Sequence, residues 1–314
     1  MNRKQTLIKA FQRGHLLSLR NPMYRQWIQK FIVDEIKGDI GKGDITSSSI
    51  LKENRNVKAI IIVQENGIVA GIDETRFLLE SYGIKVSKSV KDGAAIRNND
   101  VIMEIEGKEK NILKTDRSAL DLLQRMSGIA TLTYSLIKKT RNKIGIAPTR
   151  KTQWRYLDKK ATYLGKGLTH RLALWESILI KDNHLTAIRK EGIRDYVSES
   201  IKRAWKKRKN GNFIEIEVTN SKEALEAAKT FKELKAKQNN IPCLVMLDNI
   251  NPVKIRKIIK EIKSKGCYND VLIEASGGIK PENIVEYAKS GADVLSLGYL
   301  THSPKALDMA LIIK

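Results

Sequence analysis

The chain has 314 residues, and its 58 lysines and arginines outnumber its 35 aspartates and glutamates, which gives a formal net charge of +23. This length predicts two ordinary domains with substantial cores. No apolar run approaches the roughly 18 to 20 residues of a membrane helix, and two cysteines without paired spacing, Cys243 and Cys267, argue against a zinc module or a disulfide framework.

Residues 1–26 form a basic leader. The leader contains no acidic residue, and it lacks the apolar block of a secretory signal. We therefore expect a cytoplasmic protein. The excess of positive charge favours either a nucleic acid or a small anionic substrate as the partner, because both are attracted by a positive field.

Helical and β patterns alternate between residue 27 and residue 127, which predicts an α+β unit. The segment from Val57 to Gly71 predicts a β-hairpin with Asn66-Gly67 in its turn. A long helix is expected to open at Thr115, a candidate N-cap, with Arg117 in its first turn. The helix dipole would favour an acid there, so Arg117 is either a solvated side chain or a ligand-binding group.

After Arg141, strand and helix patterns alternate, which predicts a parallel sheet or a barrel. Seven strands are expected, so a barrel would be incomplete. The predicted strands are Lys143 to Pro148, Gly167 to Arg171, Ser177 to Lys181, Phe213 to Val218, Cys243 to Leu247, Val271 to Ala275 and Val294 to Leu297.

Polar residues follow most of these strands, and in a βα barrel the C-terminal ends of the strands form the active site. Basic side chains and one histidine stand at the first three ends: Arg150, Lys151, His170, Arg171 and Lys181. Arginine presents a planar fork to carboxylate or phosphate oxygens, and lysine adds a mobile point charge. These strand ends therefore favour a polyanionic substrate.

Acidic residues stand on the next two strands. Glu215 and Glu217 alternate along one strand, so both carboxylates lie on the same face of it, and Asp248 follows the next strand. Glu217 and Asp248 could hold Mg²⁺, or they could face a positive charge that develops on a ribosyl carbon. The alternative to both is a purely structural network of ion pairs with the neighbouring cations.

The last two strands end in glycine-containing loops. Ser276, Gly277 and Gly278 follow one strand, and Gly298 follows the other. Such glycines leave backbone N–H groups free to hold a phosphate, and the loops after the final barrel strands are its usual position. A phosphate site, several cations and two acids together predict the transfer of a phosphoribosyl group.

Short motifs follow one another along the chain from about residue 27 to the C-terminus. They are GDIT at 43–46, DRSALDLLQRMSGIAT at 116–131, TRKT at 149–152, THR at 169–171, LIKDNH at 179–184, EIEV at 215–218, MLDN at 246–249, EASGGI at 274–279 and LTHS at 300–303. In type and order they resemble the quinolinate phosphoribosyltransferase family, also called the carboxylating nicotinate-nucleotide pyrophosphorylases.

The resemblance implies an α/β fold with two domains and a homodimer as the working unit. An N-terminal α/β sandwich would span residues 27–127, with residues 303–314 returning to it, and a seven-stranded, TIM-like α/β barrel would span residues 128–302. The implied reaction joins quinolinate to 5-phosphoribosyl-1-pyrophosphate with Mg²⁺. It releases pyrophosphate and CO₂ and gives nicotinate mononucleotide for NAD biosynthesis.

The resemblance also implies a role for each site residue. The quinolinate carboxylates would be bound by Arg150, Lys151, His170 and Arg171, with Arg117 supplied by the neighbouring subunit. The ribosyl pyrophosphate would be met by the catalytic residues Lys181, Glu217 and Asp248, of which the two acids would hold Mg²⁺. The 5-phosphate would be held by Ser276, Gly277, Gly278 and Gly298.

Two other hypotheses stay open. A protein of the same fold, of the type associated with molybdate transport genes, would act on another acceptor; Gln153, Trp154 and Lys166 depart from the family pattern beside the binding cations. An RNA-binding protein would account for the net charge and for the basic run from Lys202 to Lys209, although the chain shows no RNA-binding module.

Overall fold

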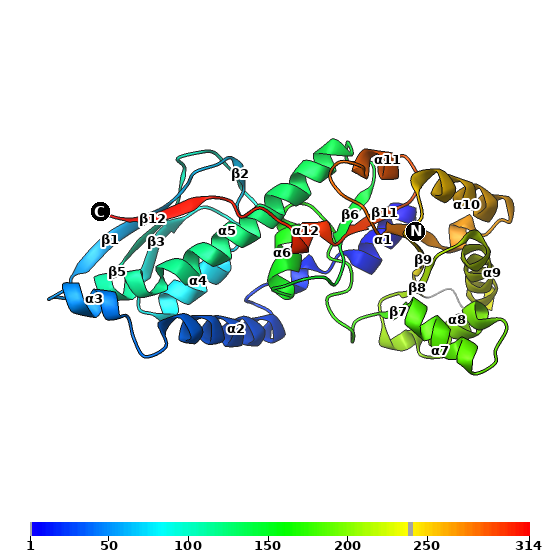
Figure 1. Ribbon diagram of the computed structural model, residues 1–314, viewed down its shortest axis with the longest axis horizontal. Helices are drawn as coiled ribbons and strands as arrows, with labels where there is room; N and C mark the ends of the chain where they lie inside the picture. The colour runs from blue at the N-terminus through cyan, green and yellow to red at the C-terminus, as the bar shows by residue number, and fades with distance from the viewer. Residues whose placement is uncertain (1, 238–240) are drawn as a thin grey trace. The chain divides into compact units, whose positions relative to one another are not determined.

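A computed structural model describes residues 2–237 and 241–314 (Figure 1). The chain forms two compact units. The parallel-sheet unit comprises the residues up to Arg13, residues 135–153 and residues 167–302, and the antiparallel-sheet unit comprises residues 14–134, 154–166 and 303–314. This division differs from the predicted boundaries, because helix α5 (Glu109–Lys139) runs past residue 127 and the start of the leader belongs to the parallel-sheet unit.

The parallel-sheet unit has six parallel strands in the order β6-β11-β10-β9-β8-β7 among its described residues. The strands are β6 (Gly145–Pro148), β7 (Ile178–Ile180), β8 (Ile214–Val218), β9 (Cys243–Asp248), β10 (Leu272–Ser276) and β11 (Val294–Leu297). The helices that follow them are α7 (Asp182–Lys190), α8 (Tyr196–Lys206), α9 (Ser221–Lys237), α10 (Pro252–Ser264), α11 (Ile284–Ala288) and α12 (Tyr299–His302). The predicted α/β fold class is confirmed.

The predicted strand from Gly167 to Arg171 is not formed, which leaves six strands where seven were expected. His170 has a φ of 54°, a left-handed conformation that interrupts an extended backbone. One N–H in the segment, that of Leu168, donates to Ile146 of β6 at 2.8 Å, but Thr169 turns its N–H to the carbonyl of Phe11. The segment therefore lacks the regular hydrogen bonds of a strand and instead contacts the N-terminal residues.

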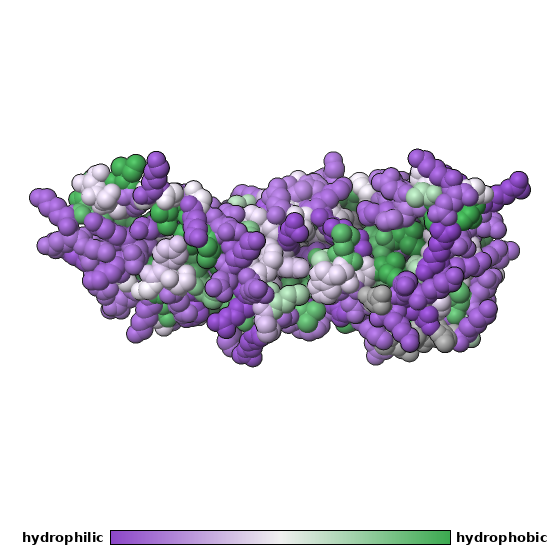
Figure 2. All heavy atoms as spheres, turned by 90° about the horizontal axis from the view of Figure 1, so that it is seen from below, coloured by the Kyte–Doolittle hydropathy of each residue, from purple (hydrophilic) through white to green (hydrophobic). Residues whose placement is uncertain are grey.

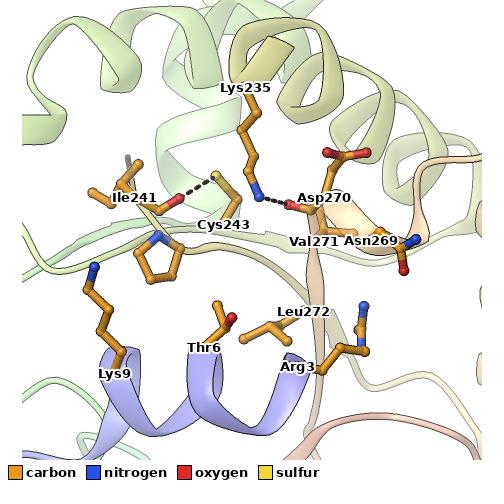
Figure 3. Close-up of a pocket in the computed structure, with 11 residues that line it drawn as sticks. Arg3, Thr6, Lys9, Lys235, Ile241, Cys243, Asn269, Asp270, Val271 and Leu272 are labelled. Atoms are coloured by element: carbon orange, nitrogen blue, oxygen red, sulfur yellow. Dashed lines mark hydrogen bonds between the residues drawn. The ribbon is translucent and has the colours of Figure 1, made fainter. Parts of the chain in front are cut away.

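Helix α1 (Arg3–Phe11) lies within the predicted leader and begins with a capping box formed by Asn2 and Gln5. One side of α1 is buried, and its Leu7, Ala10 and Phe11 join a core cluster that includes Leu272 and Val294, the first residues of β10 and β11. Figure 3 shows its other contacts, where Arg3, Thr6 and Lys9 line a cavity of about 300 Å³ beside β9 and β10. The helix thus covers the N-terminal end of the parallel sheet.

The antiparallel-sheet unit has a four-stranded sheet in the order β12-β1-β5-β3. The strands are β1 (Asn56–Val63), β3 (Lys85–Ser89), β5 (Val101–Lys108) and β12 (Met309–Ile313), and a separate two-stranded sheet contains β2 (Gly67–Ile68) and β4 (Ala95–Ile96). Figure 1 shows β12, in red, beside β1, so the C-terminal residues return to this sheet. The remaining helices are α2 (Pro22–Ile40), α3 (Ile45–Ile50), α4 (Ile72–Ser81) and α6 (Tyr156–Leu164).

The predicted hairpin around Asn66-Gly67 is not formed, because β2 pairs with β4 and not with β1. The second strand of the predicted hairpin is bound to helix α5 instead. The backbone N–H of Ile68 donates to the hydroxyl of Thr131 at 2.9 Å. The N–H of Ala70 likewise donates to the hydroxyl of Ser127 at 3.0 Å. Side-chain hydroxyls of α5 therefore hold this segment away from β1, while β4 is its partner strand.

Helix α5 begins at Glu109, six residues before the predicted N-cap Thr115. Thr115 is buried inside the helix, and its hydroxyl donates to the carbonyls of Asn111 and Ile112. Arg117 is consequently in the third turn of the helix and not in the first. The dipole argument for a ligand-binding role of Arg117 does not hold.

Charged and polar side chains dominate the face of the molecule that Figure 2 shows. Within the described ranges, none of the helices combines the length and the apolar character needed to cross a bilayer. This includes α5, the longest of them, whose exposed residues include the charged Arg117, Asp121, Lys138 and Lys139.

Candidate active site

A cavity of about 590 Å³ lies at the C-terminal ends of the strands in the parallel-sheet unit. It is lined by all but one of the predicted site residues: Arg150, Lys151, His170, Arg171, Lys181, Glu217, Asp248, Ser276, Gly277, Gly278 and Gly298. The register explains this convergence, because Ser276 of β10 pairs with Asp248 of β9 and with Ser296 of β11. Parallel strands in register present their last residues at one edge.

The arginines form a strongly basic side of the cavity. One terminal nitrogen of Arg171, Nη1, donates to the carbonyl of Ser177 at 3.0 Å, whereas its Nε is buried without a hydrogen-bond partner. Burial, and then the charge of Arg150, lower the pKa of Arg171. A buried donor without an acceptor is unfavourable, so this side of the cavity favours an anionic ligand.

Lys181 and two carboxylates form another side of the cavity. The Nζ atom of Lys181 lies 3.6 Å from Oε2 of Glu217. Burial raises the pKa of Glu217, the charge of Lys181 opposes this rise, and the charge of Asp248 adds to it. Asp248 also accepts a hydrogen bond of 2.6 Å from Nδ2 of Asn249. A carboxylate whose ionisation is opposed by burial and by a second carboxylate suits a cation between the two.

The glycines have conformations that larger residues would not adopt. Gly277 and Gly278 have φ values of 85° and 64°, in the left-handed region. A Cβ atom on Gly277 would lie 2.4 Å from Oδ1 of Asn249, so no side chain fits there. A Cβ on Gly298 would lie 3.1 Å from His302 and 3.2 Å from Lys151. The glycines thus leave backbone N–H groups accessible at the cavity wall.

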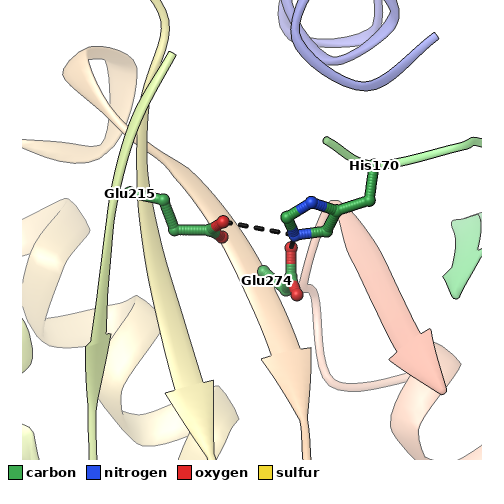
Figure 4. A group of neighbouring side chains, drawn as sticks. All are labelled: His170, Glu215 and Glu274. Carbon is green, nitrogen blue, oxygen red and sulfur yellow. Dashed lines mark ion pairs between the residues drawn. The ribbon is translucent and has the colours of Figure 1, made fainter. Parts of the chain in front are cut away.

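His170 lies on the cavity floor between two buried glutamates (Figure 4). Its Nε2 atom is 3.3 Å from Oε2 of Glu215 on β8 and 3.5 Å from Oε2 of Glu274 on β10. Its Nδ1 accepts the backbone N–H of Arg171, so the proton of the neutral ring is on Nε2, between the carboxylates. Burial would lower the pKa of His170, but the charges of Glu274 and Glu215 outweigh burial and raise it.

One histidine and two glutamates are residue types that bind metal ions, and the ligand atoms of these three side chains lie within 4.8 Å of one another. A protonated Nε2 has no lone pair for a metal ion, however, and Nδ1 already faces an N–H donor. The cluster therefore acts as an electrostatic clamp on the His170 ring, with both carboxylates close to Nε2. Glu274 was not among the predicted site residues, although it alternates with Ser276 on the same face of β10.

The clamp predicts a pH-dependent stability. Burial, and then Glu274, raise the pKa of Glu215 to about 8 from an ordinary value of 4.5. The resulting stabilisation is fully present below pH 4.5 and is lost as pH rises to about 8, because across this range the unfolded chain has released the proton that the folded chain still holds. Glu215→Gln should abolish this loss, so its melting temperature relative to wild type should rise between about pH 5 and pH 8.

Differential scanning calorimetry measures this difference. Glu233→Gln, which changes an exposed glutamate on α9, is the matched control and should show no such trend. A melting-temperature difference for Glu215→Gln that is constant with pH would contradict the raised pKa.

Arg117 is the one predicted site residue that does not line this cavity. It belongs to the antiparallel-sheet unit, where its side chain is 57% exposed and lies 3.5 Å from Oδ1 of Asp121. It lines a separate cavity of about 360 Å³ with Phe31 and Trp154, whose rings are 5.6 Å apart. Asp34, Glu35 and Asp39 line the same cavity, and the exposed end of Arg117 is accessible to a group outside its own chain.

Comparisons with known proteins place this geometry in a family. The model of the quinolinate phosphoribosyl transferase N-terminal domain matches residues 44–127, and that of the C-terminal domain matches residues 129–312. The chain belongs to the quinolinate phosphoribosyl transferase family. The two matched domains cover most of the chain, and the leader with α1 precedes them.

Relatives from distant organisms match over nearly their full length. A probable carboxylating nicotinate-nucleotide pyrophosphorylase of Methanocaldococcus jannaschii is 40% identical over 302 residues, which cover 93% of this chain and 99% of that protein. Another from Bacillus subtilis is 34% identical over 278 residues, covering 87% and 89%. The solved nicotinate-nucleotide pyrophosphorylase of Francisella tularensis superposes with a TM-score of 0.78 at 29% identity, covering 91% of this chain and 96% of that one.

Proposed function

We propose that this chain transfers the phosphoribosyl group of 5-phosphoribosyl-1-pyrophosphate to the nitrogen of quinolinate, with loss of CO₂, to give nicotinate mononucleotide for NAD biosynthesis. The observation that supports this most strongly is a single cavity with two chemically distinct sides. Arginines form one side, and Lys181, two acids and the glycine loops form the other. A dianionic acceptor and a phosphorylated donor require such a division.

The acceptor binds on the arginine side. Quinolinate carries two carboxylates on adjacent ring carbons, and the unpartnered Nε of Arg171 supplies a buried donor to one of them. Arg150 and Lys151, from the end of β6, supply further positive charge. His170 forms the floor, because its ring nitrogens already have partners. The role of His170 is therefore to shape the pocket and position Arg171.

The donor binds along the other strand ends. The 5-phosphate accepts hydrogen bonds from the backbone N–H groups of Gly277, Gly278 and Gly298, as anions do in backbone nests. Ser276 lines the cavity next to these glycines. Glu217 and Asp248 are the residues that would hold Mg²⁺, since carboxylates at neighbouring strand ends plus substrate phosphate oxygens are its common ligands. When bound, Mg²⁺ neutralises charge on the pyrophosphate.

The reaction breaks the bond between the ribosyl carbon and pyrophosphate and forms a bond from that carbon to the ring nitrogen. Positive charge develops on the ribosyl carbon in between, and the carboxylate of Glu217 stabilises it. Lys181, next to Glu217, neutralises the departing pyrophosphate. The alkylated ring nitrogen is cationic, so it stabilises the electron pair that stays on the adjacent ring carbon when CO₂ leaves, and that carbon then takes up a proton.

Arg117 completes the acceptor side from a second copy of the chain. Its side chain is exposed and lines a different cavity from the one that contains the other acceptor cations, which is compatible with a role outside its own chain. The homodimer is then the smallest active unit, with two equivalent sites related by symmetry.

The acceptor assignment is tested by comparing quinolinate with nicotinate, which lacks the second carboxylate. We expect kcat/KM for nicotinate to be lower by roughly 10²-fold or more, because a buried arginine would be left unpaired. The measurement is the rate of nucleotide formation with saturating phosphoribosyl pyrophosphate and Mg²⁺. Equal use of both acceptors would overturn the assignment of Arg150 and Arg171 to the second carboxylate, and rejection of both would overturn the proposed reaction.

A further inference from the structure

The N-terminal segment is hydrogen-bonded to the loop that contains His170 and Arg171. The carbonyl of Phe11 accepts the backbone N–H of Thr169 at 3.0 Å and its hydroxyl at 2.7 Å. The N–H of Arg13 donates to the same hydroxyl at 2.9 Å, and the side chain of Gln12 donates to Gly167 at 3.3 Å. Residues 11–13 thus take the place that a neighbouring strand has in a sheet.

A second set of contacts holds the other end of this loop. The Nε atom of Arg13 lies 3.0 Å from Oε1 of Glu176, whose side chain is almost completely buried. The other carboxylate oxygen of Glu176 accepts the backbone N–H of Leu172 at 2.5 Å. Arg13 is therefore linked to both sides of the His170-Arg171 pair.

The ring of Phe11 supports the ring of His170. Their centroids are 4.2 Å apart, and Phe213 of the neighbouring strand region contacts both rings at 5.1 and 5.6 Å. His170 has the left-handed φ of 54°, which a non-glycine residue adopts only when its surroundings hold it there. Phe11 supports the ring, while Glu215 and Glu274 hold its Nε2 atom.

We infer that residues 11–13 are positioning residues for the acceptor side of the cavity, acting through Thr169, His170 and Glu176 on Arg171. The inference rests on the proposed function for its substrate. Both matched family domains begin after this segment, the first at residue 44, so the contribution comes from a part of the chain outside them. The hydrogen bonds given above for residues 11–13 go to Gly167, Thr169 and Glu176, which flank His170 and Arg171 on the acceptor side.

Two variants test the inference without touching a residue that meets substrate. Thr169→Val removes the hydroxyl that joins Phe11 to Arg13 while keeping the side-chain volume, and Phe11→Ala removes the ring under His170. Both should raise KM for quinolinate roughly 10-fold, because small misplacements of a binding group are costly, and should leave KM for phosphoribosyl pyrophosphate within about twofold. Phe11→Leu should restore most of the quinolinate affinity lost in Phe11→Ala.

Leu7→Ala is the matched control. Leu7 is on the same helix and in the same core cluster as Phe11, but its side chain packs at Gly145 of β6, 3.1 Å from the position of a Cβ on that glycine. It should lower the melting temperature and leave both KM values unchanged. The inference is overturned if Leu7→Ala and Phe11→Ala change KM for quinolinate equally, or if either test variant weakens both substrates to the same degree.

A readout independent of turnover separates this inference from the proposed function. The ring nitrogen and carbon signals of His170 in the NMR spectrum, assigned with His170→Gln, should shift in Phe11→Ala and not in Leu7→Ala. If the wild-type chain fails to use quinolinate while these shifts appear, the proposed function fails and the positioning role stands. Unchanged His170 signals in Phe11→Ala would contradict the positioning role of Phe11, even if the enzyme is active.

Discussion

Replacing Lys181 by alanine is expected to lower kcat/KM for phosphoribosyl transfer roughly 10³-fold. The Nζ atom of Lys181 is 3.6 Å from Glu217 and lines the cavity that would hold the departing pyrophosphate. Charge on that group grows in the transition state, so loss of the lysine affects the transition state more than the bound substrate. Most of the effect should therefore be on kcat, and steady-state kinetics with both substrates varied would measure it.

The control for this variant lies on the helix that follows Lys181. Lys190→Ala removes an exposed lysine from the last turn of α7. It should leave kcat/KM within about twofold of wild type, because it removes one positive charge outside the cavity, where solvent and salt screen its effect. If Lys181→Ala keeps more than about a tenth of the activity, the lysine does not have the assigned electrostatic role. If Lys190→Ala loses as much as Lys181→Ala, the net charge and not the site is responsible.

An inactive Arg117→Ala variant and an inactive Lys181→Ala variant are expected to restore activity when mixed. Each variant alone should lose roughly 10²-fold or more, since one lacks an acceptor cation and the other the donor lysine. In a hybrid dimer, one of the two sites receives both the intact lysine and the intact arginine. After full exchange of an equal mixture, activity should reach about one quarter of wild type, because half of the dimers are hybrids and each has one complete site.

Subunit exchange has to be demonstrated separately, with differently tagged variants that are purified together. Each variant carried through the same exchange procedure without the other supplies the baseline activity. An exchanged mixture that remains at this baseline would mean that Arg117 does not act in the site of a second chain.

The elements that follow one local pattern could be predicted from the sequence. Six predicted strands of the parallel sheet are formed, because each combines a short apolar run with a helix after it. The antiparallel β1 was likewise predicted, whereas the pairing of β2 depends on hydroxyl groups of α5 that are about sixty residues away in the chain. A local hairpin signal at Asn66-Gly67 contains no information about those acceptors.

The segment from Gly167 to Arg171 shows the same limit. Its composition is compatible with a strand, but the left-handed His170 and the hydrogen bonds to Phe11 and Arg13 come from tertiary contacts. The leader that supplies those contacts lacked a recognisable periodicity. Its helix is stabilised by the capping box at Asn2 and by burial of Phe11 against the sheet.

The candidate site was more predictable than the fold around it, because the ends of parallel strands meet at one edge whatever their neighbours are. Arg150, Lys181, Glu217 and Asp248 line one cavity for this reason. The contact between Glu274 and His170 could not be predicted from strand ends, because it depends on which side chains face one another across the sheet.

The carbon balance of the reaction tests the central proposal most directly. The purified chain is incubated with Mg²⁺, phosphoribosyl pyrophosphate and quinolinate labelled in the carboxyl group beside the ring nitrogen. We expect labelled CO₂ and unlabelled nicotinate mononucleotide to appear in equal amounts, and neither to form without the phosphoribosyl donor. A folded protein that releases no label, or a nucleotide product that retains it, would contradict the proposed reaction.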